Sequence, residues 1–357
     1  MRAQSYEFLR NLTEAPSPSG YEQPAQKIFR EYIQETVDEV RTDVLGNTIG
    51  LIKGEGTGRP TLMLAGHCDE IGFMVKYIDD HGFAYFAAIG GVDEQLLPGK
   101  RVWIHSRKGR LTGVIGRKPI HLIESKDRDK VARIHTLFVD FGAKDRKEAE
   151  EAIRIGDPIT FAVGIEKLMG DRVVSRGFDD KIGSFVVAEV LRSVAEKKER
   201  PRCDLYGVST VQEEIGLRGA TTSAYRIRPD IGVAIEVGHT SDYPDVDKKQ
   251  LGEYKLGGGP IISRGANINP KVFDLFLEAA TKENIPVQVV GAPRGTGTDA
   301  NVIQLTRDGV ATGLVAVPLR YMHTPGEVAS LEDLESTCRL LTAFVYSLKE
   351  GMDFTPK

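Results

Sequence analysis

The sequence is poor in cysteine and has no long apolar run. Its three cysteines, Cys68, Cys203 and Cys338, lie far apart and form no CxxC pair, so they provide no disulfide framework and are typical of a reducing compartment. No apolar run approaches the roughly 20 residues that span a bilayer, and the N-terminal residues show neither the apolar core nor the cleavage site of a signal peptide. We therefore expect a cytoplasmic protein without a membrane segment.

The sequence also lacks a large excess of charge and is poor in tryptophan. Its 47 basic and 51 acidic residues give a net charge of −4, which provides no bulk attraction to nucleic acid or to acidic membranes. The sequence contains one tryptophan, Trp103, whereas a cleft that binds sugars usually has several. The 357 residues are 41% apolar and 27% charged, as in an ordinary globular chain, and they suffice for two domains or for one large domain with an insertion.

The apolar patterns divide the chain into two kinds of sequence. Residues 61–65 form a nearly continuous apolar run, as expected of a strand buried on both faces of a sheet. From about residue 71 to 165 the chain shows short β-type runs and few helical signals, and after residue 173 alternating strands and helices return. This pattern predicts an α/β domain of residues 1–69 and 166–357, interrupted by a small β-rich insertion at 70–165.

Apolar residues at helical spacing and short apolar runs predict the elements of the α/β part. The predicted helices span residues 4–14, 21–35, 182–190, 270–283, 300–307 and 331–348. The predicted strands of the second half span residues 205–211, 231–237, 287–290 and 311–317.

Metal-binding side chains gather at the ends of the predicted strands, where open α/β sheets usually place their sites. His67 stands two residues before Asp69, so its imidazole can bind a metal ion while the carboxylate orients the ring. On its own, such a pair is more often a hydrogen-bonded loop. Asp179 and Asp180 precede a predicted helix, where a helix cap and the helix dipole suffice to explain them. The functional alternative is that Asp179 bridges two cations and Asp180 supports it from behind.

Three further groups follow or lie within predicted strands. Glu213 and Glu214 repel each other at a strand end, and a metal ion resolves the conflict if one binds it and the other stays free to shuttle protons. An exposed acidic turn is the alternative. Glu236 lies inside an apolar strand and either binds metal or faces solvent on an edge strand. His323 follows a strand and is either a ligand or a turn histidine.

Together, the five groups supply two histidines and three or four carboxylates, a ligand set that fits two borderline divalent ions such as zinc, cobalt or manganese. The segments that contain them resemble the M42 family of metallo-aminopeptidases in order and spacing, over essentially the whole chain. This family contains the glutamyl aminopeptidases and the tetrahedral TET peptidases. The resemblance rests on AGHCDEIG (65–72), GFDDKIG (177–183), TVQEEIGLRG (210–219), GTGTDANV (295–302) and YMHTPGE (321–327).

The resemblance implies two divalent metal ions per subunit that share one carboxylate. His67, Asp179 and Glu236 would bind one ion, and Asp179, Glu214 and His323 would bind the other. The ions would activate a water molecule for attack on the first peptide bond of a peptide substrate. The implied activity is therefore that of a metal-dependent aminopeptidase.

The resemblance also assigns residues around the ions. Glu213 would be the general acid and base, and Asp69 would be the partner that orients His67. Asp180 would follow Asp179 through a cis peptide bond, which non-proline residues rarely adopt.

One position departs from the family pattern. Many family members have aspartate where this chain has Glu236, which leaves Asp242 as a rival ligand.

The glycine-rich stretch 291–299 lacks the GxxxxGK[ST] order of a phosphate loop and instead predicts a loop that lines the substrate pocket. Arg264 and Arg294 lie in predicted loops beside it and would favour acidic side chains if they faced the substrate, although exposed arginines are usually only solvated.

For the fold, the resemblance implies a zinc-peptidase-like mixed sheet flanked by helices. The β-rich stretch would be an inserted PDZ-like dimerisation domain, and the dimers would assemble into a hollow dodecamer.

Three alternatives compete with the aminopeptidase. An amide hydrolase such as a deacetylase would use a similar dinuclear site, since fold alone does not determine the substrate. An endoglucanase would use a pair of carboxylates, but His67 and His323 would then have no role. A non-catalytic assembly protein with structural metals would not need a free carboxylate such as Glu213 beside Glu214.

Overall fold

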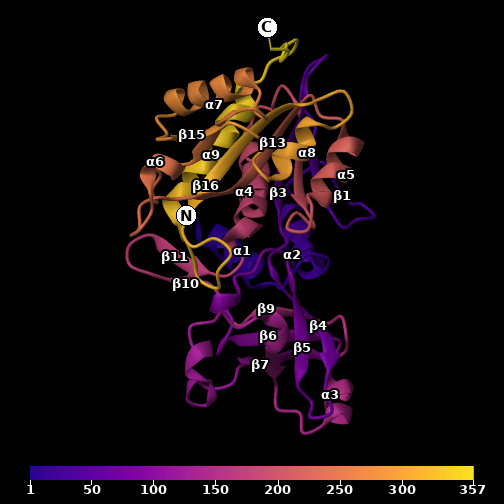
Figure 1. The fold of residues 1–357 in the computed structure, drawn as a ribbon. Helices are drawn as coiled ribbons and strands as arrows, with labels where there is room; N and C mark the ends of the chain where they lie inside the picture. Colours follow the sequence, from indigo (N-terminus) through magenta and orange to yellow (C-terminus); the bar gives the residue numbers. More distant parts are fainter. Residues whose placement is uncertain (357) are drawn as a thin grey trace.

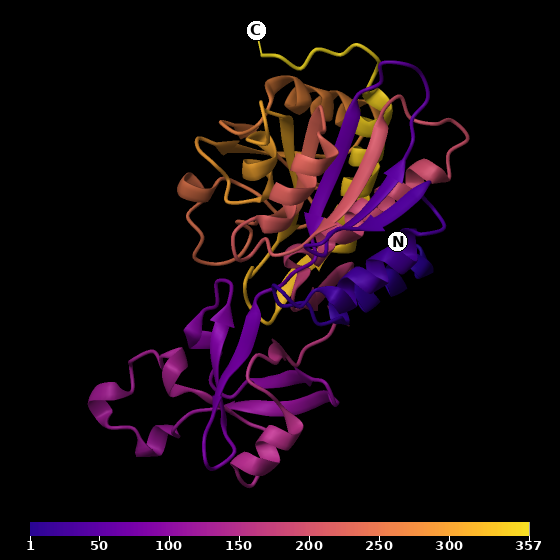
Figure 2. The same cartoon turned by 90° about the vertical axis from the view of Figure 1, so that its right-hand side faces the viewer.

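A computed structural model describes residues 1–356, which form a larger α/β body and a smaller β module at one end of it (Figures 1 and 2). The body contains both ends of the described chain, and the module is formed by a continuous middle segment, drawn in purple and magenta. Among these residues, no helix is both long and apolar enough to cross a bilayer.

An eight-stranded mixed sheet forms the centre of the body. Its strands are β1 (Glu39–Thr42), β2 (Thr48–Ile52), β3 (Thr61–His67), β12 (Asp204–Thr210), β13 (Ile231–His239), β14 (Ile261–Gly265), β15 (Gln288–Ala292) and β16 (Ala311–Leu319). In space they follow the order β1-β2-β12-β3-β13-β16-β14-β15. The four central strands β12, β3, β13 and β16 are parallel, whereas β2 and β14 join them antiparallel. Because helices cover both faces, β3 and β13 are almost unbroken apolar runs.

The helices of the body are α1 (Ala3–Glu14), α2 (Gln23–Ile33), α4 (Phe178–Ala195), α5 (Arg218–Ile227), α6 (Lys248–Leu251), α7 (Pro270–Lys282), α8 (Asp299–Gln304) and α9 (Leu331–Ser347). Helix α4 packs on β3 and β13 and contacts α1, α2 and α9, while α5 and α8 pack together against the other face. Helix α5 was not predicted from the sequence. Its buried side consists of small residues rather than large apolar ones: Gly219, Ala220, Ser223 and Ala224.

The β module is a closed antiparallel barrel with the strand order β4-β5-β8-β7-β6-β9. Its elements are β4 (Gly72–Ile78), β5 (Ala84–Ile89), η1 (Glu94–Leu96), β6 (Arg101–Ser106), β7 (Gly109–Gly116), η2 (Ile120–Leu122), η3 (Ser125–Asp127), η4 (Ile134–Thr136), β8 (Phe138–Asp140), α3 (Arg146–Ala152) and β9 (Pro158–Phe161). Phe73 makes edge-on contacts with Phe86 and Phe161 at centroid distances of 5.1 and 5.3 Å. The module thus has an apolar core of its own, and closure removes its exposed strand edges.

A small sheet and a buried ionic cluster lie where the chain passes between the body and the module. The sheet consists of β10 (Glu166–Lys167), β11 (Arg172–Ser175) and β17 (Glu327–Ser330). In the cluster, the Glu70 carboxylate accepts from Lys181 Nζ at 2.8 Å and also pairs with Arg176. Lys181 Nζ additionally donates to the carbonyl oxygens of Thr13 at 3.1 Å and Ala15 at 2.6 Å. These contacts hold the end of α1, the loop after β3 and the start of α4 together.

The mixed sheet with flanking helices and the small closed β module confirm the predicted fold class.

Candidate metal centre

Four neighbouring strands bring the predicted metal residues to one edge of the sheet. His67 is the last residue of β3, Glu236 lies near the end of β13, Glu213 and Glu214 follow β12, and His323 follows β16. Because β12, β3, β13 and β16 are adjacent and parallel, their carboxyl ends meet at the same edge. Residues that are far apart in the sequence therefore converge without any long loop.

Asp179, at the start of α4, lies between the two histidines. Its Oδ1 is 3.3 Å from Nε2 of His67, and its Oδ2 is 3.2 Å from Nε2 of His323. On the His67 side, Glu236 Oε2 is 3.7 Å from Nε2; on the His323 side, Glu214 Oε1 is 3.3 Å from Nε2. The two oxygens of one carboxylate thus face two different imidazoles, each with a further carboxylate beside it.

Backbone carbonyls determine which nitrogen of each imidazole faces the carboxylates. Nδ1 of His67 donates to the carbonyl oxygen of Asp69 at 3.0 Å, and Nδ1 of His323 donates to the carbonyl oxygen of Gly91 at 2.9 Å. Both Nε2 atoms are therefore left unprotonated in the neutral imidazole and are available as ligands.

The Asp69 side chain lies beside His67, as the resemblance implied, and it also contacts the paired glutamates. Its Oδ1 lies 3.4 Å from Nδ1 of His67, farther than the backbone carbonyl of the same residue. Its two oxygens accept the backbone N–H groups of Glu213 at 3.0 Å and Glu214 at 3.1 Å, and Ser19 donates to it at 2.6 Å. The carboxylate thus positions the paired glutamates as well as the histidine loop.

The structure tests whether a cation fits these residues. Among the described residues, Nε2 of His67 and Oε1 of Glu214 are buried without a hydrogen-bond partner. His67, Asp179 and Glu214 each place one potential ligand atom within 4.8 Å of the others, and no described lysine or arginine forms an ion pair with these carboxylates. Buried carboxylates without a counter-charge are costly, so the donor set fits divalent cations.

The pKa values show the same excess of negative charge. Burial raises the pKa of Glu213 to about 8, and burial likewise raises the pKa of Glu214 and raises that of Glu236 well above its usual range. The Asp179 and Glu214 carboxylates raise the pKa of His323 to about 11. Burial alone would lower the pKa of His67, but neighbouring carboxylates, Glu213 first, raise it well above its ordinary value. Each of these shifts favours the uptake of positive charge at this site.

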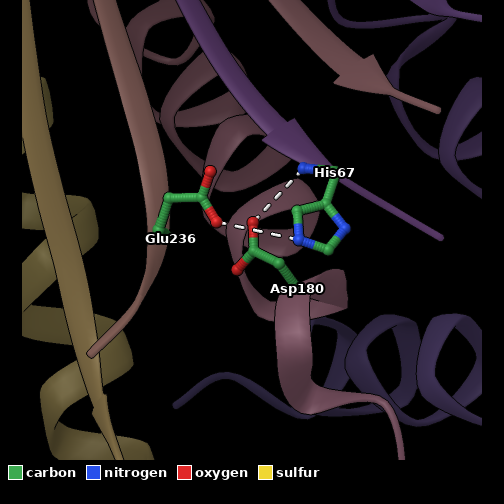
Figure 3. A group of neighbouring side chains, drawn as sticks. All are labelled: His67, Asp180 and Glu236. Carbon is green, nitrogen blue, oxygen red and sulfur yellow. Dashed lines mark hydrogen bonds and ion pairs between the residues drawn. The ribbon is translucent and has the colours of Figure 1, made fainter. Parts of the chain in front are cut away.

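Asp180 supports the centre from behind, as the sequence suggested, and its peptide bond to Asp179 is cis, as the resemblance implied. Its Oδ2 accepts the backbone N–H of His67 at 3.2 Å, and its Oδ1 accepts that of Gly183 at 2.9 Å. Figure 3 shows Asp180 directed at the backbone nitrogen of His67, while Glu236 approaches the ring of that histidine. Ligand atoms of His67, Asp180 and Glu236 also lie within 4.8 Å of one another, a grouping that the sequence did not suggest.

Two more buried carboxylates hold the centre and were not recognised from the sequence. Glu327 accepts the backbone N–H of Asp179 at 3.1 Å and that of His323 at 2.9 Å. Asp299 donates its backbone N–H to Glu236 at 3.1 Å, and its carboxylate accepts from Thr210 at 2.7 Å. Glu327 lies in the motif YMHTPGE and Asp299 in GTGTDANV, but only the tertiary contacts reveal their hydrogen-bond partners.

Burial and hydrogen bonding decide between the ligand and surface alternatives for the acidic residues. Glu236 is only 4% exposed on a strand between β3 and β16, so the solvent-facing edge-strand alternative is wrong. The Glu213 and Glu214 side chains are 11% and 6% exposed, which excludes an exposed acidic turn. Asp242 lies outside the centre, where it accepts from Arg320 Nε at 2.9 Å and Nη2 at 2.7 Å.

A cavity of about 800 Å³ opens from the metal residues. It is lined by His67, Asp179, Glu213, Glu214, Glu236 and His323, and on another side by residues 292–298. The glycine-rich loop therefore lines the pocket, as predicted. A larger cavity of about 1160 Å³ near the C-terminal segment contains none of the metal residues and has no comparable chemistry.

Comparisons with known proteins agree with this geometry. The family model described as M42 glutamyl aminopeptidase matches residues 46–340. The lysyl aminopeptidase of Pyrococcus furiosus is 39% identical over 354 residues, which cover 98% of this chain and 99% of that protein. A TET aminopeptidase from a marine sediment archaeon of the Thaumarchaeota superposes with a TM-score of 0.92 at 33% identity, covering 97% of each chain. The TET1 peptidase of Pyrococcus horikoshii, which can assemble into a tetrahedron or a large octahedral shell, superposes with a TM-score of 0.83 at 31% identity, covering 96% of this chain and 100% of that one.

Proposed function

The chain belongs to the M42 glutamyl aminopeptidase family, and on this premise we propose that it removes residues from peptide N-termini with two divalent metal ions held at the carboxyl edge of its sheet. The observation that carries this proposal is the position of Asp179, whose two oxygens face Nε2 of His67 and Nε2 of His323 at 3.3 and 3.2 Å. A carboxylate in this position suits a ligand shared by two cations.

Five residues would hold the two ions. His67, Asp179 and Glu236 would bind one, and Asp179, Glu214 and His323 the other. The unpartnered buried atoms Nε2 of His67 and Oε1 of Glu214 support this division. The mixture of imidazole and carboxylate ligands suits zinc, cobalt or manganese. When bound, such ions supply Lewis acidity and lower the pKa of a water molecule.

Glu213 is the residue we assign to proton transfer. It lies beside the proposed ligands, with Oε2 3.8 Å from Nε2 of His67, and it belongs to neither ligand set. Burial raises the pKa of Glu213 to about 8, near the pH at which a general base and acid work best. As a carboxylate it takes a proton from the attacking water, and as an acid it delivers that proton to the departing amine. Asp69 holds its backbone in place for this step.

The carboxylates of the proposed metal centre suit a substrate with a free N-terminus. A free α-amino group carries a positive charge and can approach the carboxylates that line the cavity, whereas an internal peptide segment brings no such charge. An acetylated N-terminus loses both the charge and the donor capacity. The substrate class is therefore peptides with a free N-terminus.

We further propose that the chain forms homo-oligomers in which residues 70–165 make a dimer contact and dimers assemble into dodecamers, with residues 1–69 and 166–357 as the catalytic domain. The assembly of the Pyrococcus horikoshii TET1 peptidase supports this. The β module also exposes large apolar side chains, among them Ile120 at 60% and Leu122 at 63%. Light scattering coupled to size exclusion should give the mass of a dimer or of a dodecamer, and a monomer at micromolar concentration contradicts this proposal.

Release of p-nitroaniline from aminoacyl-p-nitroanilides tests the proposed activity. The protein is stripped with a chelator and reloaded separately with zinc, cobalt or manganese, and an N-acetylated substrate serves as the control. We expect metal to restore cleavage of free-amine substrates only. Equal cleavage of the acetylated substrate, or full activity after chelation, contradicts the proposal.

A further inference from the structure

The cavity beside the metal residues has two chemically different sides. One side carries the histidines and carboxylates described above. The other is formed by residues of β13, β14, β15 and β16, by Leu251 and Tyr254, and by the glycine-rich loop. An N-terminal residue whose amide bond lies at the metal residues must place its side chain in the rest of this cavity, so the composition of the second side bears on which residue is accepted.

Apolar side chains dominate the second side. Tyr254, Ile261 and Ala316 form a buried cluster against which Val290 packs, and all four line the cavity. Val237 directly follows the proposed ligand Glu236 and lines it as well. The apolar surface therefore begins immediately beside the metal centre.

The cluster is packed tightly against the strand that carries Glu236. A Cβ atom added to Gly238 would lie 3.0 Å from Cδ1 of Ile261 and 3.1 Å from Cβ of Ala316. The absence of a side chain at this position thus lets the cluster approach β13 closely. Such a wall is held by packing and offers a fixed apolar surface to a substrate side chain.

Charged groups are scarce on this side. Among residues 1–356, the carboxylates that line the cavity are Asp179, Glu213, Glu214 and Glu236, all of which belong to the metal centre or to proton transfer in the proposed function. Arg294 is the one lysine or arginine in the described lining, and it lies exposed in the loop. A substrate lysine would find no uncommitted carboxylate here, and a substrate glutamate would meet only a solvated guanidinium.

We propose that this aminopeptidase prefers a large uncharged apolar N-terminal residue, such as leucine, methionine or phenylalanine, over lysine and over glutamate. The preference rests on the proposed function and assigns the wall of Tyr254, Ile261, Val290 and Ala316 to the recognition of the substrate side chain. An apolar side chain gains by leaving water for this wall, whereas a charged one loses hydration without gaining a buried ionic partner. The Pyrococcus furiosus relative is named a lysyl aminopeptidase, so the proposal separates the two proteins by substrate.

A panel of p-nitroanilides of leucine, methionine, phenylalanine, alanine, lysine and glutamate tests the preference with the metal-loaded full chain. We expect kcat/KM for leucine to exceed that for lysine, glutamate and alanine by roughly tenfold or more, the usual scale for discrimination by an apolar pocket. A higher kcat/KM for lysine or glutamate than for all three apolar substrates overturns the proposal.

A pair of variants in β15 locates the determinant. Val290→Asp places a carboxylate on the wall, whereas Val289→Asp places one on the neighbouring residue, which is 46% exposed and does not line the cavity. We expect the lysine-to-leucine ratio of kcat/KM to rise at least tenfold in Val290→Asp and to stay within twofold of the unmodified protein in Val289→Asp. Equal lysine-to-leucine ratios of kcat/KM in the two variants would show that the wall does not recognise the substrate side chain. Should Val290→Asp fail to fold, the panel with the unmodified protein still decides the preference.

Arg294→Ala tests the acidic alternative. We expect kcat/KM for both the leucine and glutamate substrates to stay within threefold of the unmodified protein. A glutamate preference that disappears in this variant would assign recognition to Arg294 instead.

Binding of free amino acids separates a failure of this inference from a failure of the proposed function. Calorimetric titration of the metal-loaded protein with L-leucine, L-lysine and L-glutamate does not depend on turnover. Tighter binding of leucine without hydrolysis of any substrate contradicts the aminopeptidase and leaves the apolar preference intact. Hydrolysis with a lysine or glutamate preference contradicts the apolar preference alone.

Discussion

The carbonyl oxygen of Gly91 accepts a hydrogen bond from Nδ1 of His323 at 2.9 Å, although the two residues are 232 positions apart. Gly91 follows β5 and belongs to the inserted β module, whereas His323 belongs to the α/β body. The module therefore contributes directly to the orientation of a proposed metal ligand. Its position relative to the body and the geometry of the metal centre are physically linked.

This contact predicts that bulk at Gly91 disturbs His323. An added Cβ would lie 3.2 Å from Nδ1 and 3.5 Å from Cε1 of the imidazole, while the backbone of Gly91 itself accepts other residues because its φ is not positive. We expect Gly91→Ala to weaken binding of one of the two metal ions and Gly91→Val to weaken it about 10- to 100-fold, the scale for groups that orient ligands. Calorimetric titration of the chelated protein with zinc measures this.

Gly291→Ala is the matched control, because a Cβ there would meet no atom within 4 Å and its φ is not positive either. Its metal affinities should equal those of the unmodified protein. Unchanged affinity for both ions in Gly91→Val would show that the module does not position His323.

Replacement of Glu213 separates proton transfer from metal binding. Glu213→Gln removes the titratable oxygen but keeps the size of the side chain, and the proposed ligands remain. We expect metal content to stay at the level of the unmodified protein and kcat to fall by roughly 10² or more, as for the loss of a general base. Atomic absorption and steady-state kinetics on the same preparation measure the two quantities. Near-normal turnover in this variant removes Glu213 from the mechanism.

The buried cluster of Glu70, Arg176 and Lys181 predicts a large loss of stability when its single carboxylate is neutralised. These side chains are 2% or less exposed, so Glu70→Gln leaves two buried cations without a counter-charge. We expect the free energy of unfolding to fall by roughly 3–5 kcal/mol. Urea unfolding followed by circular dichroism measures it.

The exposed pair of Lys248 and Glu253 provides the comparison for this experiment. Their side chains are 55% and 78% exposed, and solvent screens their interaction. Glu253→Gln should leave the free energy of unfolding nearly unchanged. A similar fall in the free energy of unfolding in both variants would mean that burial does not determine how much the Glu70 cluster stabilises the fold.

His105 predicts a dependence of stability on pH. Burial, reinforced by the positive charge of Arg176, lowers the pKa of His105 to about 4 in the folded module. Between about pH 6.5 and pH 4 the unfolded chain therefore binds a proton at this residue that the folded chain does not bind, so stability falls as the pH falls through this window. The expected contribution is on the order of 2 kcal/mol after allowance for partial exposure to solvent.

His105→Gln tests this contribution, because glutamine can keep a hydrogen bond to Thr160, whose Oγ1 lies 2.8 Å from Nε2 of His105. Urea unfolding of both chelated proteins at several pH values between 7 and 4 should show a shallower decline in the variant. Parallel curves for the two proteins would contradict the assignment to His105.

The sequence alone determined the types of residue and their local elements. The strong 3.6-residue periodicity of α9 and the continuous apolar runs of β3 and β16 are local properties, and all three elements lie where the pattern predicts them. His67 and His323 stand at strand ends, and parallel strands bring such ends to one edge, so both histidines could be named as candidate ligands before any contact was known. Asp179 stands at the start of a helix, and the family resemblance singled it out. Helix α5 was missed because small residues such as Ala220 and Ala224 produce no apolar periodicity.

The groups that support the centre follow from tertiary contacts and not from the local pattern. Glu327 accepts the backbone N–H of Asp179, which is 148 positions away, and that of the nearby His323. Gly91 acts through its carbonyl oxygen, a group that every residue possesses. Asp242 and Glu236 are both carboxylates near the same strand, and the partner Arg320, not the local pattern, separates them. Apolar periodicity and the type of each donor or acceptor group are local properties of the sequence. The hydrogen-bond partner of each group depends on which elements pack together in the folded chain.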